Sequence, residues 1–184
     1  MGFKLEDGLG SGRTAGVTTD NSLRVMATSL TIEHHANHYH GEAYNVLFEV
    51  TPTGADDCFF YLKNEHDEDM TLEGIWIHNT ASEYIDVKIS DIGTPSGGSD
   101  ITPVNLNCGS GKSAIGIFQQ GVNITGLSGG LNTHRIWHLG SAGMAIYNFD
   151  QDIIVSKNNV VTLYAQTGTS AISGLLVFNY HHSD

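Results

Sequence analysis

Residues 83–92, with the sequence EYIDVKISDI, decide the fold class because apolar and polar side chains alternate along them. A β-strand places successive side chains on opposite faces of its sheet. The alternation therefore predicts a strand with one aliphatic face in a core and one polar face in solvent. The inward set is Ile85, Val87 and Ile89, and the outward set is Asp86, Lys88 and Ser90.

Outward from this segment, about ten other stretches have the short apolar pattern of strands, with Gly, Pro, Asn or Ser between them. These stretches are residues 23–32, 44–51, 57–64, 70–79, 102–107, 114–119, 133–139, 145–149, 159–167 and 171–181. Turns or loops are expected at residues 52–54, 93–100, 158–159 and 168–169. Residues 34–39 alone favour a helical turn. We therefore predict an all-β, jelly-roll-like β-sandwich of about 8–10 short strands over residues 23–184, preceded by an extended N-terminal arm at residues 1–22.

Composition agrees with one β-rich domain and narrows the classes of partner. The chain has 184 residues, of which 40% are apolar and 15% are charged. Eight Lys and Arg residues against twenty Asp and Glu residues give a net charge of −12, which disfavours nucleic acid and anionic membranes as partners. No apolar run has the length of a signal peptide or of a membrane span, so synthesis in a cytoplasm is expected.

The arm and a histidine-rich loop are the expected assembly contacts. Residues 1–22 contain five glycines and little periodicity, and such a segment becomes ordered when it docks on a neighbouring subunit. Scarce lysine leaves the predicted edge strands poorly protected, which also favours an oligomer. The expected contacts are Phe3, Leu5, Leu9, Arg13, His34, His35, His38 and His40.

The same histidines are weak candidates for a metal site. His34 and His38 would share one face of a helix, and His38 and His40 would share one face of a strand. No carboxylate or thiol other than Glu33 and Glu42 lies at a supporting spacing. We therefore predict a hydrogen-bonding loop or subunit contact, with no metal and no cofactor.

Three short motifs suggest chemistry that their surroundings do not support. The acidic run at residues 64–69, NEHDED, offers oxygen ligands for Ca²⁺ but lacks the EF-hand pattern, which favours a solvated turn. The stretch GSGKS at residues 109–113 lacks the first glycine of a P-loop and precedes a predicted strand. The stretch GLSGG at residues 126–130 matches a nucleophile elbow in letters but also precedes a strand. No catalytic residue is assigned, and we predict that the protein is not an enzyme.

Aromatic residues and cysteines allow two further interpretations. A sugar-binding platform could be formed by Trp76, Trp137, Tyr39, Tyr44, Tyr84 and Tyr147, although such side chains more often fill a core or an interface. Cys58 lies in an apolar run and Cys108 lies in a Gly/Ser turn, and we predict two free thiols rather than a disulfide.

Three segments resemble a set of β-rich structural proteins of tailed bacteriophages. They are HHANHYHGEAYNVLFEVTPTGADDCFFYLKNEHDEDMTLEGI at residues 34–75, DIGTPSGGSDITPVNLNCGSG at residues 91–111 and QQGVNITGLSGG at residues 119–130. The resemblance implies a virion protein, with a capsid decoration (cement) role as the first expectation. It further implies a homotrimer that binds the major capsid protein on the outer capsid surface and is made in the host cytoplasm. The alternative is a tail- or fibre-associated module that binds a receptor or glycan.

Overall fold

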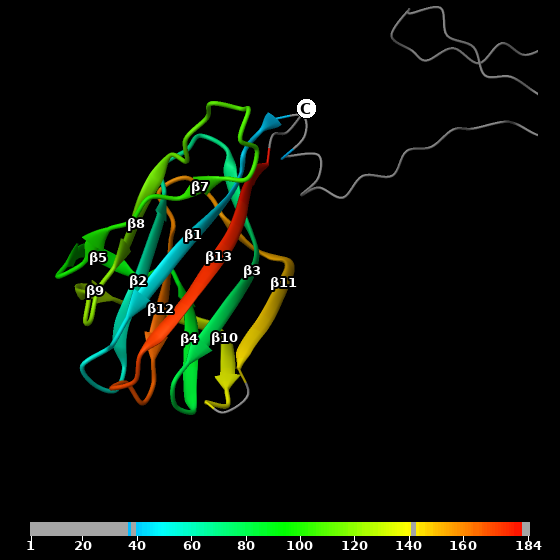
Figure 1. The fold of residues 1–184 in the computed structure, drawn as a ribbon. Coiled ribbons are helices and arrows are strands. Elements are labelled where there is room, and N and C mark those ends of the chain that lie inside the picture. The colour runs from blue at the N-terminus through cyan, green and yellow to red at the C-terminus, as the bar shows by residue number, and fades with distance from the viewer. Residues whose placement is uncertain (1–36, 38–39, 141–142, 182–184) are drawn as a thin grey trace, which may run out of the picture. The chain divides into compact units, whose positions relative to one another are not determined.

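The structure is a computed structural model that describes residue 37, residues 40–140 and residues 143–181 (Figure 1). The predicted arm at residues 1–22 and the predicted strand at residues 23–32 lie outside the described residues, as does all of the predicted helical turn except Asn37. The described part of the chain is all-β, with no α-helix.

Thirteen strands run through the described residues, and most of the long ones match the predicted segments. Their bounds are β1 Ala43–Val50, β2 Asp57–Asn64, β3 Asp69–Asn79, β4 Glu83–Ile89, β5 Ile92–Ser96, β6 Ser99–Asp100, β7 Val104–Asn105, β8 Gly116–Gln120, β9 Thr125–Ser128, β10 Leu131–His138, β11 Met144–Val155, β12 Val160–Ala165 and β13 Ile172–His181.

Two antiparallel sheets form the two layers of a sandwich (Figure 1). The five-stranded sheet has the order β11-β3-β13-β1-β7, and the six-stranded sheet has the order β10-β4-β12-β2-β8-β6. A separate two-stranded sheet pairs β5 with β9. The chain moves from one large sheet to the other at every step from β1 to β4 and again at every step from β10 to β13. The predicted β-sandwich is therefore confirmed.

Aliphatic and aromatic side chains from the inner faces of both sheets form the main core. The cluster contains Phe59 and Phe60 of β2, Ile75 of β3, Ile85 of β4 and Phe178 of β13, each with no exposed side-chain surface. The predicted inward set of β4 is correct, because Ile85 and Val87 are fully buried and Ile89 packs against the cluster. Removing such side chains from water is the main stabilising contribution to a sandwich of this kind.

Residues 90–130 connect β4 to β10 and form a second layer of packing. Cys58, Tyr61 and Val160 lie on the outer face of the six-stranded sheet, where Ile124 and Leu127 from this connection cover them. The loop predicted at residues 93–100 is wrong in part, since β5 and β6 lie in it, and β9 forms at residues 125–128, where no strand was predicted. These short strands lack the apolar alternation that would identify them in the sequence.

Other differences from the predicted elements have local backbone causes. The strand predicted at residues 83–92 ends at Ile89 because Ser90 has a φ of 62°, which interrupts extended pairing. The strand predicted at residues 145–149 extends to Val155 as β11, across a bulge between Asn148 and Ile153. The predicted turns at 158–159 and 168–169 are confirmed, with positive φ at Asn158 and at Gly168.

Candidate functional site

The structure describes only one of the predicted assembly contacts. His40 is half-buried, while Phe3, Leu5, Leu9, Arg13, His34, His35 and His38 lie outside the described residues. Within the described ranges, no group of three or more His, Cys, Asp or Glu side chains is arranged to hold a metal ion. Cys58 is buried, Cys108 is exposed, and both are free thiols.

The three motifs all lie in turns or strands. In the acidic run, Asn64 donates to the backbone oxygens of Glu68 and Val155, so the run forms a turn anchored to β11. In GSGKS, Lys112 Nζ lies 2.7 Å from Glu42 Oε1, and the strand β8 follows. In GLSGG, Ser128 ends β9 and the strand β10 comes next. The flanking elements therefore differ from those of a P-loop or a nucleophile elbow.

The fold separates the aromatic residues that were considered as one platform. Tyr44 is in the core, Tyr147 packs against the core, and Trp76 lies on the five-stranded sheet. Tyr39 lies outside the described residues. Among the five that the structure describes, only Tyr84 and Trp137 come together in the open, and the burial of Tyr44 rules out a platform of all six aromatic residues.

Tyr84 of β4 and Trp137 of β10 are cross-strand partners on the outer face of the six-stranded sheet. Their ring centroids lie 4.2 Å apart with an interplanar angle of 40°. Tyr84 is 44% exposed and Trp137 is 48% exposed, so each ring still offers about half of its surface to solvent. The pair stabilises the contact between β4 and β10 and leaves an open apolar area beside it.

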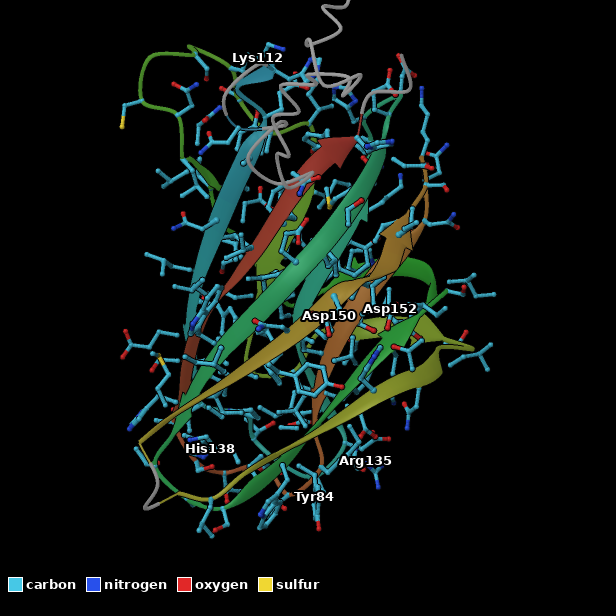
Figure 2. All side chains as sticks on the ribbon, turned by 90° about the vertical axis from the view of Figure 1, so that its right-hand side faces the viewer. Tyr84, Lys112, Arg135, His138, Asp150 and Asp152 are labelled. Carbon is cyan, nitrogen blue, oxygen red and sulfur yellow. The ribbon has the colours of Figure 1, made fainter. Side chains whose placement is uncertain are left out.

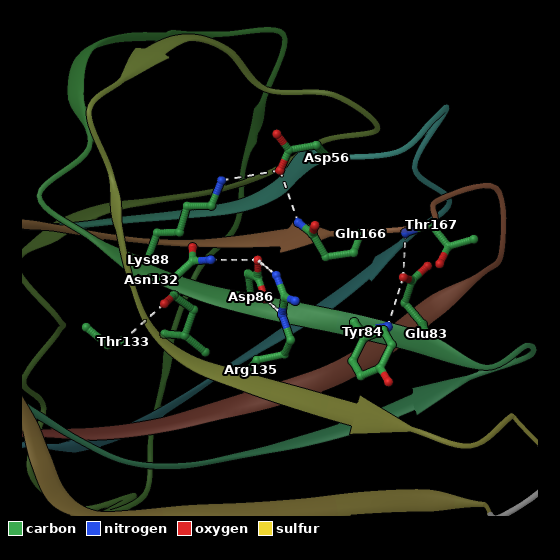
Figure 3. Close-up of polar contacts among 11 residues, drawn as sticks. Asp56, Glu83, Tyr84, Asp86, Lys88, Asn132, Thr133, Arg135, Gln166 and Thr167 are labelled. Atoms are coloured by element: carbon green, nitrogen blue, oxygen red, sulfur yellow. Dashed lines mark hydrogen bonds and ion pairs between the residues drawn. The ribbon is translucent and has the colours of Figure 1, made fainter.

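Arg135 and Asp86 form the next cross-strand pair on the same face (Figure 3). Arg135 Nε lies 2.5 Å from Asp86 Oδ1, and Arg135 Nη2 lies 2.7 Å from Asp86 Oδ2. Asn132 Nδ2 donates to Asp86 Oδ2 at 2.9 Å. The hydrogen bonds from Arg135 lower the pKa of Asp86, and burial of the carboxylate opposes them. Asp86 points outward as predicted, but Arg135 and Asn132 cover it, so it is buried rather than solvated.

Gln166, just after β12, extends this surface on the other side of β4. Its backbone N–H donates to the Tyr84 carbonyl at 2.9 Å, which fixes it next to that residue. Its side-chain Nε2 donates to Asp56 Oδ1 at 3.0 Å, and Lys88 Nζ lies 3.3 Å from the same oxygen (Figure 3). Lys88 also lies over the ring of Tyr164, with its Nζ 3.5 Å from the centroid.

We call Trp137, Tyr84, Arg135, Asp86 and Gln166 the aromatic–cation surface. Figure 2 shows its members Tyr84 and Arg135 near the end of the sandwich opposite to Lys112. The guanidinium carbon of Arg135 is 5.7 Å from the Tyr84 ring centroid, so apolar and hydrogen-bonding groups adjoin one another. This arrangement suits binding through stacking and hydrogen bonds.

A buried carboxylate holds the Tyr84 end of this surface in place. Glu83 has no exposed side-chain surface and accepts a hydrogen bond from the Tyr84 N–H at 3.0 Å. It also accepts from Thr167 N at 2.7 Å and from Gly168 N at 2.9 Å. Glu83 thereby ties the start of β4 to the turn between β12 and β13, next to Gln166.

A second exposed surface crosses the outer face of the five-stranded sheet. Four apolar side chains are cross-strand neighbours there, and we call Ile146, Trp76, Leu175 and Leu47 the apolar row. Ile146 is 58% exposed and Leu47 is 62% exposed. A groove of about 480 Å³ lies beside three members of the row, Trp76, Leu175 and Leu47, and Met144 and Glu49 also line it. Contiguous exposed apolar side chains of this kind mark interaction surfaces.

Sequence reasoning named Tyr84, Trp137 and Trp76 as aromatic candidates, but it missed Arg135, Gln166 and the three aliphatic members of the apolar row. Gln166 and Asp56 are 110 positions apart in the chain, and nothing in either local sequence connects them. The apolar row had a partial signal, since leucine or isoleucine stands at outward positions of otherwise alternating strands.

No family model, no curated protein and no solved structure matches this chain. In the part of the chain that the structure describes, no helix has the length and apolar character needed to span a membrane.

Proposed function

We propose that this protein is a non-catalytic structural component of a tailed-phage virion, in a capsid decoration role on the outer capsid surface. The observation that carries the proposal is the apolar row, because a band of apolar side chains that is half-buried in the middle and exposed at both ends suits subunit association. The resemblance of residues 34–75, 91–111 and 119–130 to phage structural proteins supplies the virion context.

The partner for the apolar row is a second copy of this chain. With a net charge of −12, two copies repel each other over most of their surfaces. The row itself contains no charged side chain, and Glu49 is the one acidic residue among those described that lines the groove beside it, so copies that meet there avoid much of this repulsion. Three intervals between its four strands span about 14 Å, which is wide enough for the central part of a subunit contact.

The strand order gives further support. We infer a jelly roll from the strand order. The five-stranded sheet contains the run β1-β13-β3-β11, and the six-stranded sheet contains the run β2-β12-β4-β10. In each run, strands from the first set, β1 to β4, alternate with strands from the second set, β10 to β13. Jelly rolls recur in viral capsid domains. The fold alone does not define a function, so it supports the proposal only together with the apolar row.

Sedimentation velocity tests the subunit contact with a matched pair of variants. Ile146→Asp places a carboxylate in the apolar row, whereas Ile154→Asp changes an equally exposed isoleucine on the same strand outside the row. We expect the wild type and Ile154→Asp to sediment as oligomers, with a trimer as the expected state, and Ile146→Asp to sediment as a monomer. A monomeric wild type, or an oligomer that survives Ile146→Asp, would contradict this contact.

Virion position requires a separate experiment. A reconstruction of the virion of the encoding phage, with an antibody fragment against this protein, is expected to show density on the outer capsid. Density confined to the tail or fibres would overturn the decoration role and leave the subunit contact to be judged by sedimentation.

A further inference from the structure

We propose that the aromatic–cation surface is a carbohydrate-binding site that takes a neutral pyranose ring. This function is separate from subunit association, because Tyr84 and Trp137 lie on the six-stranded sheet and the apolar row lies on the five-stranded sheet.

The two rings provide the stacking part of the site. One face of a pyranose ring presents mainly C–H groups, which pack on the electron-rich face of an aromatic ring. Tyr84 and Trp137 hold each other at a centroid distance of 4.2 Å while each remains nearly half exposed. Their backbones are paired across neighbouring strands and the two rings contact each other, so the rings lose little conformational freedom when a sugar binds.

Hydrogen-bonding groups border the rings on two sides. Arg135 is 52% exposed and uses two of its N–H groups on Asp86, so its guanidinium has further donors for sugar hydroxyls. Gln166 lies on the other side of Tyr84 and offers its side-chain oxygen as an acceptor. Asp56 is 65% exposed and can accept from a hydroxyl while it holds Lys88. Stacking with a few placed polar groups gives orientation as well as affinity.

The charges favour a neutral sugar over an acidic one. Arg135 is neutralised by Asp86, and Lys88 is neutralised by Asp56. The remainder of the protein carries an excess of carboxylates, which repel a sialylated or sulfated ligand. An unsubstituted hexose in a glucose-, galactose- or mannose-containing chain avoids this repulsion.

Tryptophan fluorescence offers a direct test because the chain contains two tryptophans on different sheets. Trp76→Phe leaves Trp137 as the only reporter, and Trp137→Phe leaves Trp76 as the only reporter. The probes are maltohexaose, cellohexaose, galactotetraose and mannohexaose, with sialyllactose and heparin as charged comparisons. We expect at least one neutral probe to shift the Trp137 emission with a saturable curve and to leave the Trp76 emission unchanged.

Variants of the site then assign the binding to named side chains. Trp137→Ala and Tyr84→Ala are each expected to weaken binding of that probe about tenfold, as loss of an aromatic contact does. Leu131→Ala, another exposed apolar residue on β10, is expected to leave the affinity unchanged. Saturation-transfer NMR on the wild type gives an independent measurement if a tryptophan variant does not fold.

Three results would overturn the site. They are no response to any neutral probe at millimolar concentration, binding that survives both Trp137→Ala and Tyr84→Ala, and binding of only sialyllactose or heparin. Ile146→Asp, which disrupts the apolar row, is expected to leave sugar binding intact, so failure of the subunit contact and failure of this site are distinguishable.

Discussion

Arg135 holds Asp86 with two parallel hydrogen bonds from Nε and Nη2, across neighbouring strands and 49 positions apart in the chain. Asp86 is buried beneath the guanidinium, whereas Arg135 remains half exposed. The pair therefore joins the edge strand β10 to β4 and places a cation beside the Tyr84 ring.

Asp86→Asn is expected to lower stability at neutral pH and to have less effect in acid. The pKa of Asp86 is lowered in the folded protein, so its stabilising contribution is present above the unfolded value of about 3.9 and is lost as the pH falls through the lower folded value. Urea denaturation at pH 7 and at pH 3 measures the difference. Asp152→Asn, an exposed aspartate on β11, is the control and is expected to change little at either pH.

Glu83→Gln is expected to destabilise the fold by about 2 kcal/mol or more, because an amide nitrogen then faces backbone N–H donors that the carboxylate had satisfied. Those donors are on Tyr84, Thr167 and Gly168. Glu65→Gln, at an exposed position, is the matched control. Equal urea midpoints for the two variants would show that the buried carboxylate is not needed.

The two cysteines are expected to differ sharply in reactivity. Burial raises the pKa of the Cys58 thiol to about 12, with the nearby Asp91 acting in the same direction, so little thiolate forms at pH 8. Cys108 is exposed. Alkylation with iodoacetamide, followed by mass spectrometry of peptides, should modify Cys108 quickly and Cys58 only after denaturation. Rapid labelling of both residues in the folded protein would contradict the packing around Cys58.

Three glycines provide a graded test of backbone strain and close contact, and one of them, Gly168, lies in the turn between β12 and β13. Gly168 has a φ of 70°, and an added Cβ would lie 2.0 Å from the Gly54 carbonyl oxygen. Gly111 has a φ of 66° but open space around it, and Gly109 has neither constraint. We expect Gly168→Ala to lower the melting temperature most, Gly111→Ala to cost about 1 kcal/mol from backbone strain alone, and Gly109→Ala to be nearly neutral. A different order would be inconsistent with this geometry.

Part of the fold is predictable from local patterns. The alternation at residues 83–92 identifies the inward side chains of β4, and Asn158 and Gly168 indicate two turns correctly. These features depend on neighbours within a few positions, which is the range over which strand alternation and turn chemistry act. Short strands such as β5 and β6 were missed because few residues pair in them and their side chains are mostly exposed.

The candidate surfaces depend on strand order and register. The sequence by itself determined that Asp86 points away from the core, but it did not identify Leu47 and Ile146 as exposed apolar side chains. The tertiary structure decided that Arg135 covers Asp86 and that Leu47 and Ile146 belong to one row across the sheet. The physical reason is that alternation along a strand is set by the local backbone, whereas neighbours across a sheet are set by how all strands together bury one core.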